Sequence, residues 1–169
     1  SAAVALLLAH EALAYAHLND PRQAMTALRR AEDEYAHATD DDWPEFLQFF
    51  DRGALDTSAA RVHSKLGLTE PHHRTEAITR LHNAIDNGPT DRVRQRAFNL
   101  IWLAACTLAD GDLTTGAHIG NQALTSVASL NSPRLIKHLE PLNTQLQRHP
   151  NHADLRHLTH ELRQLSTPA

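Results

Sequence analysis

The residues of this 169-residue sequence most able to do chemistry are its thirteen histidines. Four of them lie near the C-terminal end: His149, His152, His157 and His160. His157 and His160 are three positions apart and would share one face of a helix, where neutral imidazoles can chelate zinc or nickel. However, no cysteine accompanies them, and Pro150 places the first pair in a loop. We therefore interpret these histidines as solvated surface residues.

Other patterns that could indicate catalysis are incomplete. His10 is followed by a glutamate, but the second histidine of the zinc-protease motif is absent. Ser58 and Ser64 can each be paired with His63, yet such pairs are common along helices, and a nucleophile also needs an orienting partner for its base. No glycine-rich phosphate loop is present, because Gly111 and Gly116 fit a turn and a close helix crossing better. We therefore expect no enzymatic activity, cofactor or metal.

The charged residues limit the classes of molecule that this protein is expected to bind. The formal net charge is −4, which argues against a nucleic-acid surface, since such surfaces carry a basic excess. Residues 1–60 contain four Arg or Lys and eleven Asp or Glu, so this half is acidic. Residues 61–169 contain twelve Arg or Lys and nine Asp or Glu, so this half is slightly basic. This asymmetry fits a polar contact between the two halves, a docking face for a basic partner, or simply an uneven solvated surface.

The single cysteine and the apolar residues 1–10 indicate the cellular compartment in which the protein is expected. Cys106 lies in the apolar run 100–106, which indicates a small core residue, and one cysteine fits a reducing cytoplasm. Residues 1–10 are apolar but lack an initiator Met and a basic segment, and are too short to span a bilayer. We expect a cytoplasmic chain without a membrane segment, and a fragment of a longer protein that begins inside a helix.

Strong helix formers dominate the chain, and β-branched residues never form alternating runs, so the predicted fold is all-α. Turn signals predict eight helices joined by short loops. The acidic residues 40–42 are expected in one of these loops, and the third helix has a possible break at Arg52-Gly53. The helices are predicted at about 3–18, 21–38, 44–66, 71–87, 91–109, 113–130, from 133 onward, and 151–165.

An internal repeat accompanies these helices. Small residues at Ala12, Ala24 and Ala31 recur 92 positions later as Ala104, Gly116 and Ala123, where close helix crossings need small side chains. Another copy begins near residue 60 and carries a loop of about five extra residues, 68–72. We therefore predict one domain over 1–169, with helix pairs at 3–38, 44–88 and 89–130 and a polar capping pair at 132–166.

The repeat resembles the tetratricopeptide (TPR) pattern. Residues 77–81, 94–97, 103–105, 108–113 and 120–124 look like the TPR-type regions of actinobacterial transcriptional regulators. The resemblance implies a TPR-like array of about eight antiparallel helices, an α-α superhelix. In such regulators a helix-turn-helix domain of the XRE class precedes this region, which senses a ligand or mediates self-association. This sequence contains no helix-turn-helix segment, and a generic helical bundle remains the alternative fold.

Carrying over the inward-facing positions of that family predicts a concave binding groove. Its central cations, Arg61 and Lys65, are one helical turn apart and would suit an extended peptide or an amphiphile with a carboxylate. Alternatively, the apolar positions pack against neighbouring helices or a second subunit and leave no open groove. The predicted groove residues are Leu13, His17, Thr57, Arg61, Lys65, Phe98, Ile101 and Ala105.

The resulting functional expectation is a sensor or interaction domain of a bacterial regulator. It would bind a peptide, a small signal molecule or a protein partner, without direct nucleic-acid contact. The alternative is a constitutive protein–protein scaffold or a homodimerisation module that has no ligand.

Overall fold

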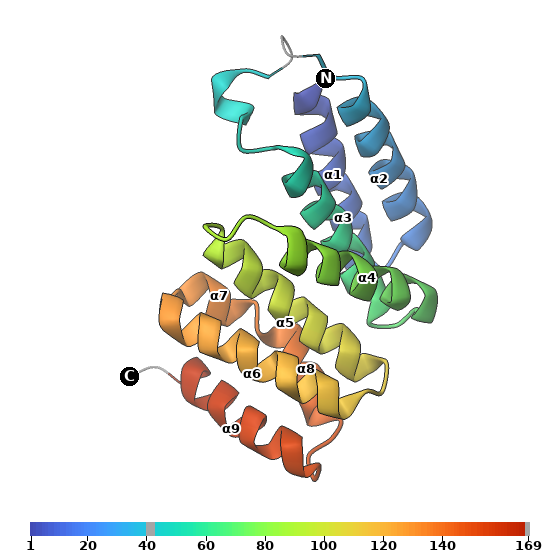
Figure 1. The fold of residues 1–169 in the computed structure, drawn as a ribbon. Helices are drawn as coiled ribbons and strands as arrows, with labels where there is room; N and C mark the ends of the chain where they lie inside the picture. Colours follow the sequence, from blue (N-terminus) through green and yellow to red (C-terminus); the bar gives the residue numbers. More distant parts are fainter. Residues whose placement is uncertain (40–42, 168–169) are drawn as a thin grey trace. The chain divides into compact units, whose positions relative to one another are not determined.

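The computed structural model describes residues 1–39 and 43–167, and this part of the chain is helical, without strands (Figure 1). The predicted all-α class is therefore confirmed. Asp40, Asp41 and Asp42, expected in a loop, lie outside the described residues. Within the same part, no helix combines the length and apolarity needed to cross a membrane. The helices are α1 (Ala2–His17), α2 (Pro21–Ala36), the 3-10 turn η2 (Glu45–Leu47), α3 (Arg52–Gly67), α4 (Pro71–Asn87), α5 (Val93–Ala109), α6 (Leu113–Leu130), α7 (Pro133–Lys137), α8 (Glu140–Gln147) and α9 (Ala153–Ser166).

The α1–α2 and α5–α6 hairpins close with the same turn. Asn19 and Gly111, 92 residues apart, both adopt positive φ angles, of 57° and 93°. The N–H groups of Leu18, Asn19 and Asp20 donate to the carbonyls of residues 14, 16 and 15. Positions 110, 111 and 112 donate in the same way to residues 106, 108 and 107. The 92-residue repeat is thus present in the backbone hydrogen bonds.

The helix that follows each turn is capped identically. The Asp20 carboxylate accepts a hydrogen bond from the Gln23 N–H at 3.1 Å, and the Asp112 carboxylate accepts one from the Thr115 N–H at 3.1 Å. An aspartate at this position satisfies an N–H group that has no partner within the helix. Pro21 occupies the first position of α2, where its missing N–H costs nothing.

The predicted helix over 44–66 is wrong in its first part. Residues 45–47 form a single 3-10 turn, and α3 begins at Arg52, where the possible break was expected. Asp51 is the reason, because its carboxylate accepts the Ala54 N–H at 2.9 Å and so starts a new helix. Leu47 and Phe50 are buried and anchor the intervening segment.

Two further boundaries differ from the prediction. The joint between α3 and α4 comprises only residues 68–70, as short as residues 18–20 and 110–112, so the expected extra loop over 68–72 is absent. The helix predicted from Pro133 onward is divided into α7 and α8. Pro141 lies in the first turn of α8, and because a proline has no N–H it cannot continue the hydrogen bonds of α7.

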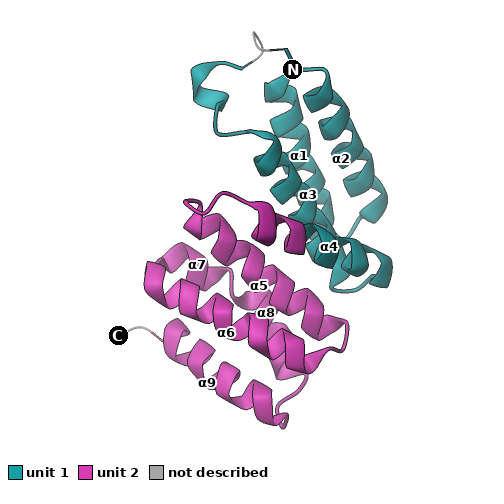
Figure 2. Ribbon diagram, in the orientation of Figure 1, with its two compact units in different colours: residues 1–80 teal, residues 81–169 magenta. Residues whose placement is uncertain are grey.

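The described chain forms two compact units, residues 1–80 and residues 81–169, with the boundary inside α4 (Figure 2). In unit 1, α1 packs against α2 and α3. One core cluster consists of small and aliphatic side chains: Ala12, Ala16, Ala24, Ala27, Leu28, Ala59, Val62 and Leu66. A second gathers around Phe50, where Tyr35 lies edge-on to Trp43 and Phe50.

In unit 2, α5 packs against α6 and α8, and α9 packs against α6. The expected turn at Gly111 and close contact at Gly116 are both present, because a Cβ at position 116 would collide with Leu108 Cδ2. Cys106 is buried in this core, as its apolar neighbours indicated.

Candidate functional site

Arg61 and Lys65 lie one turn apart on α3, and both are half-buried. Their position follows from the helix face that α3 buries, which includes Leu55, Val62 and Leu66. The two cations lie at the edge of that face, where long side chains can cover apolar surface and keep their charges in water.

His17 joins these cations from the last turn of α1, which packs against α3. Partial burial lowers the pKa of His17 below its usual 6.5, and the positive charges of Lys65 and Arg61 lower it further. The structure therefore places three of the eight predicted groove residues within electrostatic reach of one another in unit 1, as two cations and an imidazole whose pKa they lower.

Leu13 and Thr57 are also partly buried in unit 1. Leu13 packs against the core cluster that contains Ala12 and Leu28, so part of its side chain serves the core. Thr57 lies one turn before Arg61 on the same helix.

The three predicted groove residues of unit 2 have different environments. Phe98 is partly buried and contacts the ring of His138 edge-on, with the ring centroids 4.6 Å apart. Ile101 and Ala105 are completely buried in α5 and present no open surface. Their burial fits the alternative in which the apolar positions pack against neighbouring helices. A groove that joins all eight residues stays a prediction.

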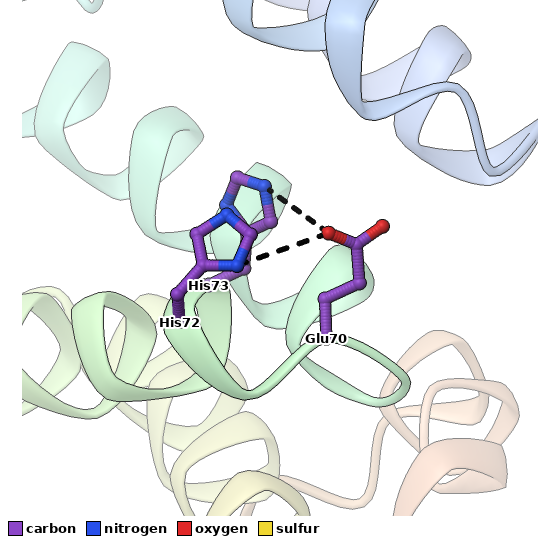
Figure 3. Close-up of side chains that lie close together, drawn as sticks. All are labelled: Glu70, His72 and His73. Carbon is purple, nitrogen blue, oxygen red and sulfur yellow. Dashed lines mark ion pairs between the residues drawn. The ribbon is translucent and has the colours of Figure 1, made fainter.

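A second cluster, which the sequence analysis did not identify, lies at the joint of α3 and α4 (Figure 3). Within the described residues, Glu70, His72 and His73 are the one group of three that could hold a metal ion, with ligand atoms within 4.8 Å of one another. The Glu70 Oε2 atom is 3.9 Å from His72 Nδ1 and 3.9 Å from His73 Nε2. Behind them, His63 Nδ1 is 3.1 Å from His73 Nδ1.

Burial and neighbouring charges lower the pKa of both inner imidazoles. Burial lowers the pKa of His63 from 6.5 to about 4, and the charge of Arg80 contributes to the same direction. Burial also lowers the pKa of His73, and His72 lowers it to a smaller extent. The negative charge of Glu70 raises the pKa of His73 and so opposes these two effects. Knowing that the joint has three residues would have allowed this contact to be predicted, because His63 and His73 then lie only a few positions from either end of the joint, on facing helices.

The C-terminal histidines make separate surface contacts. His157 Nε2 lies 3.2 Å from the Glu161 carboxylate, and His160 contacts the Gln164 amide at 3.1 Å. Both histidines are exposed, in keeping with their interpretation as surface residues. His149 and His152 are half-buried instead, and the Nδ1 atom of His152 is buried without a hydrogen-bond partner, so that interpretation does not hold for His152.

Comparisons with known proteins assign no family. No protein-family model matches the chain, and neither a curated protein nor a solved structure matches it. The resemblance to the TPR-type regions of regulators therefore stays a prediction.

Proposed function

We propose that this chain is a non-enzymatic binding domain that recognises a carboxylate-bearing peptide or small signal molecule. The observation that carries this proposal is the pair of cations Arg61 and Lys65, one turn apart on α3, whose charges both act on His17 of α1. Both charges that act on His17 are positive, so an anionic group placed here would be attracted by each of them. Arginine can hold a carboxylate through two parallel N–H donors, and lysine adds a compact charge.

The wider context of the proposal is a TPR-like sensor domain in a cytoplasmic bacterial regulator. The repeated α1–α2 and α5–α6 hairpins support the TPR-like part, because such arrays are built from similar helix pairs. The resemblance to XRE-type regulators supports the regulatory part. A ligand that binds one conformation better than another would shift the activity of an attached helix-turn-helix domain.

The test uses a fluorescent hexapeptide of alternating leucine and glutamate with a free C-terminus. Its control peptide has glutamine in place of glutamate and an amidated end. We expect the acidic peptide to bind in fluorescence anisotropy. The Arg61→Gln/Lys65→Gln variant should bind it about 10- to 100-fold more weakly, since hydrogen bonds to charged groups contribute about 1.5–3 kcal/mol.

The matched control is Arg29→Gln/Arg30→Gln, which removes two exposed charges from α2 in the same unit. Equal weakening in both double variants would mean that net charge alone attracts the peptide. That result would contradict the proposal, as would equal binding of the acidic and the neutral peptide. Urea unfolding curves of the double variant and of the single variant Lys65→Gln measure their stability. A variant that is as stable as the wild type but binds the peptide more weakly has lost binding and not stability.

A constitutive scaffold or dimerisation module is the second candidate, and exposed apolar side chains favour it. On α1, Leu7 is 69% exposed, and around η2, Phe46 and Phe49 are 73% and 62% exposed. Large exposed apolar side chains that gather on one surface are typical of protein contact sites. Analytical ultracentrifugation should then detect a dimer that the Leu7→Gln or the Phe46→Gln/Phe49→Gln variant weakens. A chain that stays monomeric at all concentrations would exclude the homodimer.

A further inference from the structure

The joint of α3 and α4 gathers nitrogen and oxygen donors that belong to no part of the proposed peptide site. We propose that Glu70, His72 and His73 bind one divalent transition-metal ion, best matched by Zn²⁺. In this site His63 is a positioning residue that holds the imidazole of His73 in the ligating orientation.

The distances between the donor atoms are close to those a metal requires. Zinc binds nitrogen and oxygen ligands at about 2.0–2.1 Å, so two ligands of a tetrahedral site lie about 3.4 Å apart. The Glu70 Oε2 atom is 3.9 Å from each of the two imidazole nitrogens that face it, His72 Nδ1 and His73 Nε2. A bound ion would therefore draw the Glu70 oxygen roughly half an ångström closer to each of these two nitrogens, and the three ligand atoms as a group already lie within 4.8 Å of one another. The side chains of His72 and Glu70, 74% and 34% exposed, have room for such shifts.

His63 accounts for the orientation of the third ligand. With the two Nδ1 atoms 3.1 Å apart, one imidazole donates a hydrogen bond to the other. When His73 donates its Nδ1–H to His63, its Nε2 carries the lone pair, and Nε2 is the atom that faces Glu70. Histidine ligands of metals usually donate their other ring N–H in this way, which fixes the tautomer and the ring.

The backbone holds the ligands on a rigid joint. A Cβ at Gly67 would lie 2.7 Å from the Arg74 Cα, so α3 and α4 approach each other as closely as a glycine allows. The Arg74 guanidinium donates to the Gly67 carbonyl at 2.8 Å, and the Arg74 N–H donates to the Glu70 carbonyl at 3.1 Å. The first turn of α4, which carries His72 and His73, is thus fixed to the end of α3.

The donor set selects the class of ion. Two imidazoles and one carboxylate suit zinc, and also nickel and copper, better than the hard cations magnesium and calcium, which prefer oxygen. Three protein ligands leave a fourth position for water or for a donor from a partner.

The test is isothermal titration of the metal-free full chain with ZnCl₂, together with the visible absorption of bound Co²⁺. We expect one Zn²⁺ per chain and a tetrahedral Co²⁺ spectrum. The Glu70→Gln and His72→Ala variants should each bind Zn²⁺ at least 10-fold more weakly. Both positions tolerate substitution, since neither side chain is buried. The matched control, His157→Ala/His160→Ala, removes the exposed i, i+3 pair of α9 and should bind Zn²⁺ like the wild type.

His63 is tested by the pair His63→Leu and His63→Asn. We expect His63→Leu to weaken Zn²⁺ binding about 10- to 100-fold, the usual effect of losing such a partner. His63→Asn should restore most of the affinity, because its amide oxygen can accept the same hydrogen bond. Unfolding in urea with EDTA measures the stability of both variants separately. The metal site is overturned if Glu70→Gln and His72→Ala bind Zn²⁺ as tightly as the wild type, or if the α9 control abolishes binding.

Discussion

Acidification should destabilise the chain through His63. This imidazole is buried on α3, and its pKa in the folded chain is about 4, mainly because of burial. The positive charge of Arg80 lowers the pKa further, protonation of His73 or His72 would act in the same direction, and Glu76 opposes them. The folded chain therefore resists protonation of His63 at pH values where the unfolded chain accepts the proton.

The sign and size of the effect follow from the two pKa values. Above pH 6.5 neither state binds the proton, so the contribution of neutral His63 to stability is fully present. As the pH falls from 6.5 to 4, the unfolded state is protonated first, and the loss of stability is complete once the pH passes below the folded pKa. This difference between pKa values corresponds to at most about 3.4 kcal/mol. Rearrangement of the neighbouring side chains reduces it, so we expect about 2 kcal/mol.

The assay is urea unfolding at pH 7.5 and pH 4.5, in the presence of EDTA, for the wild type, His63→Leu and His157→Leu. Other groups titrate over this range in all three proteins, so the informative quantity is the difference between them. The free energy of unfolding should fall by about 2 kcal/mol less in His63→Leu than in the wild type. His157→Leu, which alters an exposed histidine, should behave like the wild type. If the wild type and His63→Leu lose the same stability, the burial argument is refuted.

Three further predictions concern the helix packing, each measured by thermal or urea unfolding. Leu66→Ala should cost about 2–5 kcal/mol, because Leu66 is completely buried in the core of unit 1; a loss below 1 kcal/mol would contradict that burial. Gly67→Ala should lower the free energy of unfolding by about 1–3 kcal/mol more than Gly53→Ala, a substitution at an exposed glycine, because the Cβ at position 67 would meet backbone atoms of Arg74. Equal losses of stability in the two variants would refute the close crossing of α3 and α4. Removal of the cap in Asp20→Ala should cost about 1 kcal/mol, and an unchanged midpoint would exclude the capping role.

Local signals were sufficient to predict most of the helices. Pro21 and Pro71 mark the first positions of α2 and α4, and both helices begin at these residues. The segment after Pro44 was predicted as helix because the acidic residues before it and Pro44 itself are helix-start signals. Asp51 provides a second start signal, and it is the Asp51 cap that begins α3. Pro141, which separates α8 from α7, was present in the sequence as a break signal but was not used.

The two clusters differ in how far the sequence could predict them. Arg61 and Lys65 are neighbours through helical periodicity alone, so their proximity needs no tertiary information. The contact of His63 with His73 depends on the length of the joint between α3 and α4. With the expected extra loop of five residues, the two imidazoles would not face each other. Ile101 and Ala105 were assigned to a groove by analogy, whereas their burial depends on how the helices of unit 2 pack.

The two matching turns also have a consequence for how the chain folds. In each turn the hydrogen bonds join residues no more than five positions apart, so closing either turn costs little chain entropy. A chain with such local contacts is expected to fold fast. Because the α1–α2 and α5–α6 turns are equivalent, nucleation can begin in either half, as it can in proteins built from repeats. A substitution that slows one turn would therefore redirect folding to the other turn instead of stopping it.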